Sequence, residues 1–173
     1  MKNNPLQTEF AKFGKLQNEL AELRTLTEST SAWRAQQERT CDLSDKAALA
    51  EIGRLQVLTG LLPGRIAARE EALVQAEADL LLSAHSFIQA TLGPQARQLL
   101  ANVKEKIKSS LQALFSDEGE LRNAIEKTDT VQQVDQLVAS IRVDMNPIGG
   151  TASYVQRLLE IFKKVESFTE KTA

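Results

Sequence analysis

Residues 45–91 read DKAALAEIGRLQVLTGLLPGRIAAREEALVQAEADLLLSAHSFIQAT, and their apolar side chains recur in alternating steps of three and four. This spacing predicts one long helix whose apolar seam packs lengthwise on a second helix. The seam stays in register across Pro63-Gly64, where a loop would reset it, so we expect a kinked helix instead of two helices. Its two rows are Ile52, Thr59, Ile66, Leu73, Leu80 and Phe87, and Ala48, Leu55, Leu62 and Ala76.

The preceding residues supply the partner helix. Asn4 is suited to cap it and Pro5 to its first turn. Hydroxyl side chains crowd residues 25–31 and compete for backbone bonds, so we expect continuity to about Cys41 with any break near Ser29–Ser31. A turn at residues 42–45, with Ser44 as the next cap, would fold the two helices antiparallel. The seam of this helix consists of Leu6, Phe13, Leu20 and Thr27 in one row and Leu16, Leu23 and Thr30 in the other.

Shorter helices are predicted after Leu92-Gly93-Pro94, where a glycine cap and a proline end the long helix. We expect helices over about 94–115, from a Ser116 cap to Lys127, from Thr128 or Thr130 to Met145, and over about 151–168, with a loop at 146–150. The predicted fold is therefore all-α. A long kinked antiparallel hairpin, residues 1–92, precedes a C-terminal bundle, residues 93–173, packed on one end of the hairpin.

Composition and charge narrow the function by exclusion. The 21 basic and 23 acidic residues give a net charge of −2 and are spread evenly, so no segment forms the basic stripe that binds a phosphate backbone. With one cysteine no internal disulfide forms, and the sequence shows neither a secretory signal nor a membrane-spanning run. We therefore expect a cytoplasmic protein.

Residues for catalysis or metal binding are few. The single histidine, His85, and the single cysteine, Cys41, fall at opposite ends of the second helix, so they form neither a nucleophile pair nor a zinc site. His85 is interpreted as a polar flank of the seam. Neighbouring carboxylates do not share a helix face, and Glu-x-x-His is absent. We expect no enzyme, no cofactor and no metal site.

The function that remains is protein contact: a non-enzymatic helical interaction or structural protein, such as a scaffold, adaptor, assembly chaperone or structural subunit. LLPGRI, residues 61–66, resembles segments of small bacterial and phage coiled-coil proteins, and the resemblance gives no residue a role. Large side chains off the seam need another surface, which predicts self-association or a helical protein partner. These candidate interaction residues are Phe10, Leu26, Trp33, Val57, Leu58 and Leu61.

Two further hypotheses stay open at this point. A basic cluster predicts, as the alternative function, a module peripheral to a membrane or associated with nucleic acid. It comprises Arg97, Lys104, Lys106 and Lys108. A turn near residue 43 would also bring the weakest parts of the two long helices opposite each other, with Thr27 meeting Thr59, which predicts a hinge. The hinge residues are Thr27, Thr59, Gly60, Pro63 and Gly64.

Overall fold

The computed structural model describes residues 4–42 and 44–172. Helices make up 89% of the structure and no strand occurs among these residues, which confirms the all-α class. The elements are α1 (Pro5–Thr40), α2 (Lys46–Phe87), η1 (Ile88–Leu92), α3 (Gly93–Leu111), η2 (Gln112–Leu114), α4 (Glu118–Glu126), α5 (Asp129–Ser140) and α6 (Gly150–Thr172).

Two compact units divide the chain. One is the hairpin unit, Thr8–Asp79, and the other joins Leu80–Ala173 with the start of α1 up to Gln7. The sequence placed its domain boundary after residue 92 instead, at the expected end of the long helix.

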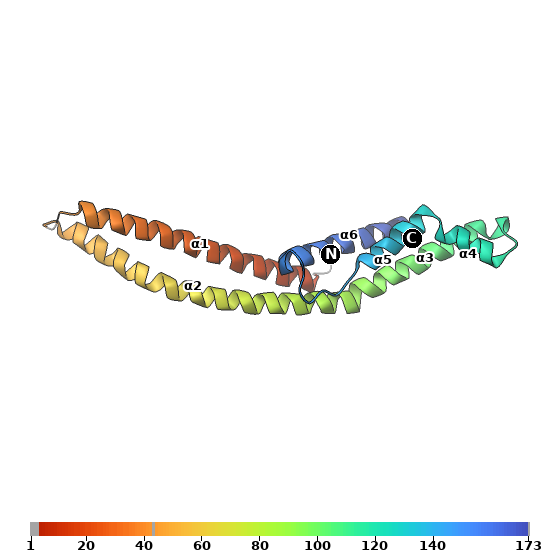
Figure 1. Cartoon of the computed structure of the whole chain (residues 1–173), viewed down its shortest axis with the longest axis horizontal. Helices are drawn as coiled ribbons and strands as arrows, with labels where there is room; N and C mark the ends of the chain where they lie inside the picture. Colours follow the sequence, from red (N-terminus) through yellow and green to blue (C-terminus); the bar gives the residue numbers. More distant parts are fainter. Residues whose placement is uncertain (1–3, 43, 173) are drawn as a thin grey trace. The chain divides into compact units, whose positions relative to one another are not determined.

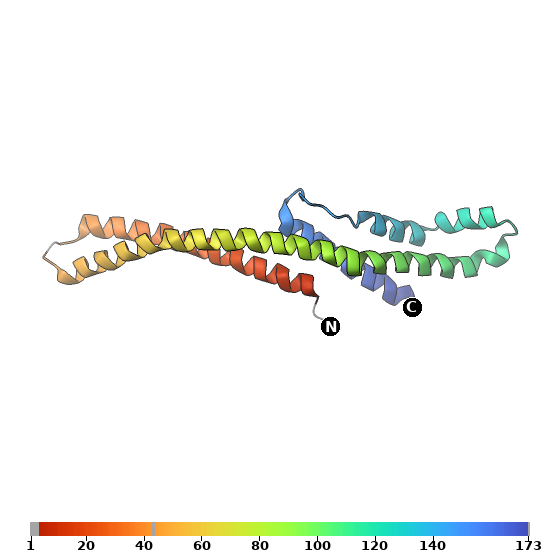
Figure 2. The same cartoon turned by 90° about the horizontal axis from the view of Figure 1, so that it is seen from below.

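In the hairpin unit, α1 and α2 lie side by side and run antiparallel (Figures 1 and 2). Ion pairs cross between the helices, one joining Arg24 Nη2 to Glu70 Oε1 at 2.7 Å and one joining Arg69 Nε to Glu19 Oε2 at 3.2 Å. Side chains of the predicted seam are the most buried of this unit, as a heptad pattern requires. The buried ones are Phe13, Leu20, Thr30, Leu55 and Leu62, and the other seam positions are half-buried.

The hydroxyl-rich segment of α1 does not break the helix. Thr25, Thr27 and Ser29 donate their hydroxyl protons to the carbonyls of Ala21, Leu23 and Leu26, each three or four residues back. These bonds satisfy the side chains without taking a donor from the helix. The break considered near Ser29–Ser31 is therefore absent.

α2 likewise continues through Pro63. The predicted pairing of Thr27 with Thr59 is wrong: Arg34 Nη1 donates to Thr59 Oγ1 at 3.2 Å, and Arg34 lies about two turns beyond Thr27. The register between the helices differs from one centred on residue 43. Residue 43, the predicted centre of the turn, lies outside the described residues.

The caps of two helices are aspartates, where serines were predicted. Asp45 Oδ1 accepts from the backbone N–H groups of Ala47 and Ala48, whereas Ser44 donates to Asp42. The bonds from the Ser44 backbone and hydroxyl lower the pKa of the Asp42 carboxyl. In the same way Asp117, not Ser116, caps α4 by accepting from the Glu120 N–H at 2.9 Å. A carboxylate at such a position also complements the helix dipole.

The predicted end of the long helix at Leu92-Gly93-Pro94 is wrong. η1 is a π-helical turn in which the Gly93 N–H donates to the Ile88 carbonyl, and Gly93 has a right-handed φ of −64°. Pro94 lacks an N–H and its ring crowds the carbonyl four residues earlier, and a π turn relieves this by widening the backbone. The helical run is therefore 69 residues long, from Lys46 to Leu114.

The second unit packs α4, α5 and α6 against α3. α5 ends at Ser140, so Met145 lies beyond it in the connection to α6 and is exposed, contrary to the predicted helix through that residue. Gly149 and Gly150 adopt positive φ values of 87° and 86°, which glycine tolerates, and α6 then begins. The core of this unit includes Leu80, Leu92, Leu99, Val103, Val134, Val155, Leu158 and Val165.

Candidate interaction surfaces

Most of the off-seam apolar residues of the hairpin are exposed. Leu26 and Trp33 on α1 are each 48% exposed, and Leu58 and Leu61 on α2 are 47% and 60% exposed. Val57, next to Leu58, is exposed as well, whereas Phe10 is half-buried. The surface these residues form depends on which side of the hairpin each one occupies.

A groove of about 480 Å³ lies on one side of the hairpin, between α1 and α2. Leu26 of α1 lines it together with Arg65 and Ala68 of α2, so these three residues lie on the same side. Residues one heptad apart on a helix stay on the same face, with a drift of about 20°. Trp33 follows Leu26 by one heptad, and Leu58 and Leu61 precede Arg65 and Ala68 by one. Leu26, Trp33, Leu58 and Leu61 therefore share one side of the hairpin, called here the apolar face.

The opposite side of the hairpin carries mostly polar side chains. It is marked by the ion pair of Arg24 with Glu70, and the heptad rows through these two residues carry few apolar side chains. Phe10 falls in the row of Arg24, so it does not belong to the apolar face. Val74 lies about 160° around α2 from Leu58, at roughly 100° per residue, so it belongs to this opposite side. The rows consist of Phe10, Gln17, Arg24, Ser31 and Glu38 on α1 and of Leu49, Gln56, Pro63, Glu70 and Glu77 on α2, and Leu49 is exposed.

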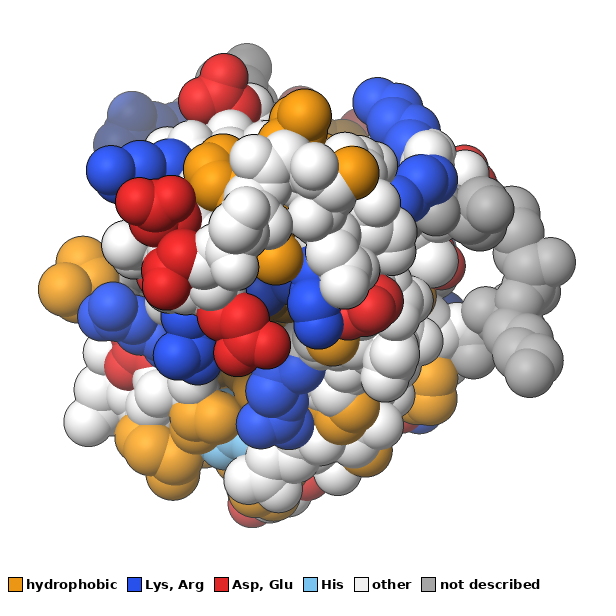
Figure 3. Space-filling view, turned by 90° about the vertical axis from the view of Figure 1, so that its right-hand side faces the viewer, with side chains coloured by type: hydrophobic (Ala, Val, Ile, Leu, Met, Phe, Trp, Pro, Cys, Tyr) orange, Lys and Arg blue, Asp and Glu red, His pale blue; other side chains and the backbone are white. Residues whose placement is uncertain are grey.

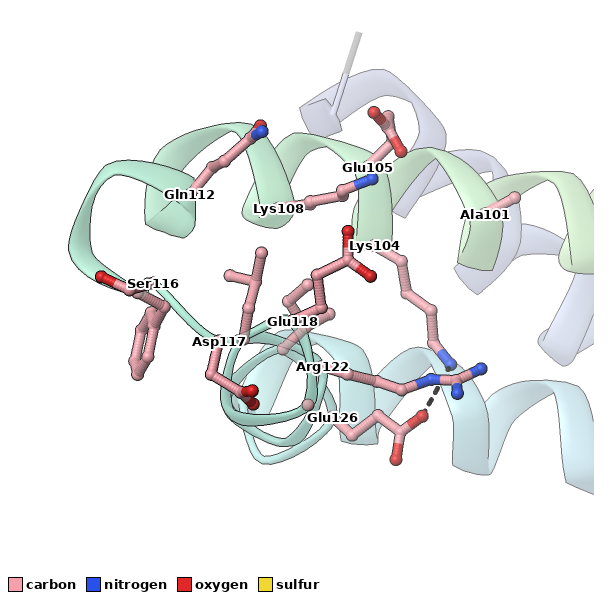
Figure 4. A pocket seen from close by; sticks show the side chains of 14 residues that line it. Ala101, Lys104, Glu105, Lys108, Gln112, Ser116, Asp117, Glu118, Arg122 and Glu126 are labelled. Carbon is pink, nitrogen blue, oxygen red and sulfur yellow. Dashed lines mark ion pairs between the residues drawn. The ribbon is translucent and has the colours of Figure 1, made fainter.

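The basic cluster of α3 divides between two sides of its helix. Lys104 and Lys108, four residues apart, both line a cleft of about 810 Å³ between α3 and α4, whereas Arg97 and Lys106 do not. Lys106 points roughly 160° away from both. Figure 4 shows Lys104 reaching across the cleft to Glu126, with an Nζ to Oε1 distance of 3.9 Å.

Acidic side chains outnumber basic ones in this cleft. Arg122 adds a third cation, but four carboxylates line the same cleft: Glu105, Asp117, Glu118 and Glu126. On the face shown in Figure 3, basic and acidic side chains are interspersed, and no area of a single sign stands out. The arrangement lacks the concentrated positive charge that a phosphate-rich partner needs.

His85 has a structural role that the sequence did not indicate. Its Nε2 lies 3.2 Å from the Asp144 carbonyl, in the connection between α5 and α6, and its ring packs edge-on to Tyr154. The Tyr154 hydroxyl donates to the Arg142 carbonyl at 2.8 Å and accepts from the Asp144 N–H at 3.2 Å. Burial raises the pKa of Tyr154. The predicted role of His85 as a flank of the seam is replaced by a loop anchor.

Tyr154→Phe tests this anchor. The change keeps the ring but leaves the Arg142 carbonyl and the Asp144 N–H without their partner, so we expect the free energy of unfolding to fall by about 1–2 kcal/mol. Urea unfolding measures the loss, and amide exchange at Asp144 should become faster. Ser153→Ala, at the exposed neighbouring position, is the control and should change neither. Unchanged exchange at Asp144 in the Tyr154→Phe variant would contradict the anchor.

The predicted hinge residues lie within continuous helix. Thr27 and Thr59 bond back to carbonyls of their own helices, and methyl groups built on Gly60 and Gly64 would meet no atom within 4 Å. The hinge itself stays a prediction. Cys41 is a free thiol beside the turn.

Within residues 4–42 and 44–172, no group of three or more His, Cys, Asp or Glu side chains is placed to hold a metal ion. The same residues contain no helix that is both long and apolar enough to cross a membrane. Comparison with known proteins gives no relative: no family model, no curated protein and no solved structure matches the chain.

Proposed function

We propose that this protein is a non-enzymatic interaction or structural protein, a scaffold, adaptor, assembly chaperone or structural subunit, whose hairpin docks on another helical protein. The single observation that carries the proposal is the one-sided hairpin. Four large apolar side chains lie exposed on the apolar face, while the opposite side exposes two, Leu49 and Val74, among mostly polar residues.

Exposed apolar area of this kind favours association. Burying a large aliphatic or aromatic side chain gains about 1.5–3 kcal/mol, so the half that is still exposed on each residue is worth roughly 1 kcal/mol. The heptad spacing of the face suits a helical partner, whose side chains would fit between those of α1 and α2. Trp33 resembles the aromatic anchors that dominate protein interfaces.

A site-specific photo-crosslinker tests the proposal. Leu61→p-benzoylphenylalanine places it on the apolar face, and Val74→p-benzoylphenylalanine places it on the opposite side at a position of similar exposure, 70% against 60%. Irradiation in host cells should give a discrete protein adduct from position 61 and none from position 74. Equal labelling from both positions, or labelling from neither, would refute the proposed docking face.

A further inference from the structure

We infer that the π turn η1 is a device that realigns the helical run: it takes up one extra residue between α2 and α3, so that the apolar stripes before and after it both face α6. Gly93 and Pro94 hold the turn in place. This device lies within the second unit and does not depend on the apolar face of the hairpin.

The buried stripe of the helical run changes side at η1. Residues of an α-helix follow one another at about 100°, and on that scale the centre of the stripe that begins at Leu92 is rotated by about 100° from the centre of the stripe that ends at Ile88. This angle is that of a single residue. The first stripe consists of Leu80, Ala84, Phe87 and Ile88, and the second of Leu92, Ala96, Leu99 and Val103.

A straight α-helix would place polar residues in line with the first stripe. Steps of four and three residues from Phe87 lead to positions that point the same way as Leu80 and Ala84. The side chains at these positions are Thr91, Gln95, Gln98 and Asn102. The last three are exposed in the structure. Turning amide side chains into an apolar core costs free energy, so the extra residue keeps them outside.

α6 is the helix that needs both stripes on one side, because it is continuous and contacts the run before and after η1. Before the turn, the rings of Phe162 and Phe87 pack edge-on with centroids 5.2 Å apart. After the turn, Val165 and Leu99 line the same groove of about 340 Å³. A π turn closes on the fifth residue back instead of the fourth, so it holds one residue more than an α turn and returns the second stripe to the side of the first.

Gly93 and Pro94 fix the turn at this place. A π turn moves along a helix when the next N–H group takes up a bond to the fifth residue back. The next residue is Pro94, which has no N–H group to donate to the Gln89 carbonyl. Gly93 leaves room for the Ile88 carbonyl oxygen, which lies 2.8 Å from where a β-carbon would be. The dipeptide therefore prevents the turn from moving into α3.

Single-residue deletions test the device in the full-length chain. Deleting Ala90, which is exposed within the turn, removes the extra residue, and Pro94→Ala in the same chain avoids a proline inside the resulting α-helix. The melting temperature should stay within about 4 °C of that of Pro94→Ala alone, since both stripes still face α6. Deleting Ala101 instead, an exposed alanine of α3, is the matched control. It rotates Val103 and the residues after it by about 100° and should lower the melting temperature by roughly 10 °C or more.

Gly93→Ala gives a second readout, which reports on the π turn itself. In the Pro94→Ala chain it should lower the melting temperature, because the added methyl group meets the Ile88 carbonyl oxygen. Once Ala90 is also deleted that contact is gone, and the same substitution should raise the melting temperature, since alanine is the better helix former. Equal losses from the two deletions, or tolerance of both, overturn the inference. A loss from Gly93→Ala that persists after the deletion of Ala90 also overturns it, because the turn would then form without the extra residue.

Discussion

Leu99→Ala is expected to lower the free energy of unfolding by about 3 kcal/mol, within the 2–5 kcal/mol range for a buried leucine cut back to alanine. Leu99 is 2% exposed and lies on α3, the helix against which α4, α5 and α6 pack. The truncation removes apolar contacts and leaves a cavity that surrounding helices fill only in part. Urea unfolding followed by circular dichroism measures the change.

Leu114→Ala is the matched control for this prediction. Leu114 belongs to the same helical run but is 73% exposed, so the same chemical change should alter stability by less than about 0.5 kcal/mol. If the two variants lose equal stability, α3 is not the central helix of this unit. The cost would then reflect helix propensity alone.

Gly93→Ala is expected to destabilise the protein by about 1–3 kcal/mol, although alanine is the better helix former. A methyl group at residue 93 would lie 2.8 Å from the Ile88 carbonyl oxygen, the acceptor of the Gly93 N–H in the π turn. Because this oxygen belongs to the backbone, the clash with the added methyl group cannot be relieved by rotating a side chain. The turn has to shift, and the bond that forms it is strained. Thermal unfolding compares the variant with wild type.

Gly64→Ala supplies the control within the same run of helix. No atom lies within 4 Å of the added methyl group there, so we expect a gain of about 0.5–1 kcal/mol from the lower entropy of the unfolded chain. The two variants make the same substitution and should move stability in opposite directions. A gain in both would show that the helix passes residue 93 without the π turn.

The sequence predicted the seam of the hairpin because a heptad pattern is local and repeats many times. The positions expected inside, such as Leu20 and Leu62, are buried, and Pro63 lies within one helix, as the unbroken register indicated. The end at Gly93-Pro94 was wrong for a physical reason. Glycine followed by proline ends a helix in most settings, and the π turn that accommodates them depends on one shifted backbone bond that leaves no mark on the side-chain pattern.

The heptad pattern accounts for the exposure of the candidate interaction residues but not for the side of the hairpin on which they lie. Leu26, Trp33, Leu58 and Leu61 were correctly placed off the seam, but a seam alone does not tell one side of a hairpin from the other. Phe10 was grouped with them for that reason. The crossing ion pairs of Glu19 with Arg69 and of Arg24 with Glu70 distinguish the sides, and they depend on a register that the sequence misplaced.

For the basic cluster and for His85, too, the sequence did not predict the contacts made with other helices and loops. The sequence grouped Lys104 and Lys108 in one basic cluster, yet the carboxylates of α4 that line the same cleft come from a different part of the chain. The partner of His85, the Asp144 carbonyl, is 59 residues away. Contacts between residues so far apart in the sequence depend on how the helices pack on one another. The spacing of residues within one helix does not predict that packing.

Oxidative footprinting of the full-length protein inside host cells tests the central claim, that the apolar face is covered by a protein partner. Trp33, exposed in the isolated chain, should be oxidised several-fold more slowly in cells than in dilute purified protein. Met145, exposed and far from the hairpin in sequence, serves as the reference for oxidant dose. Equal oxidation of Trp33 in both settings, after scaling to Met145, would contradict the account.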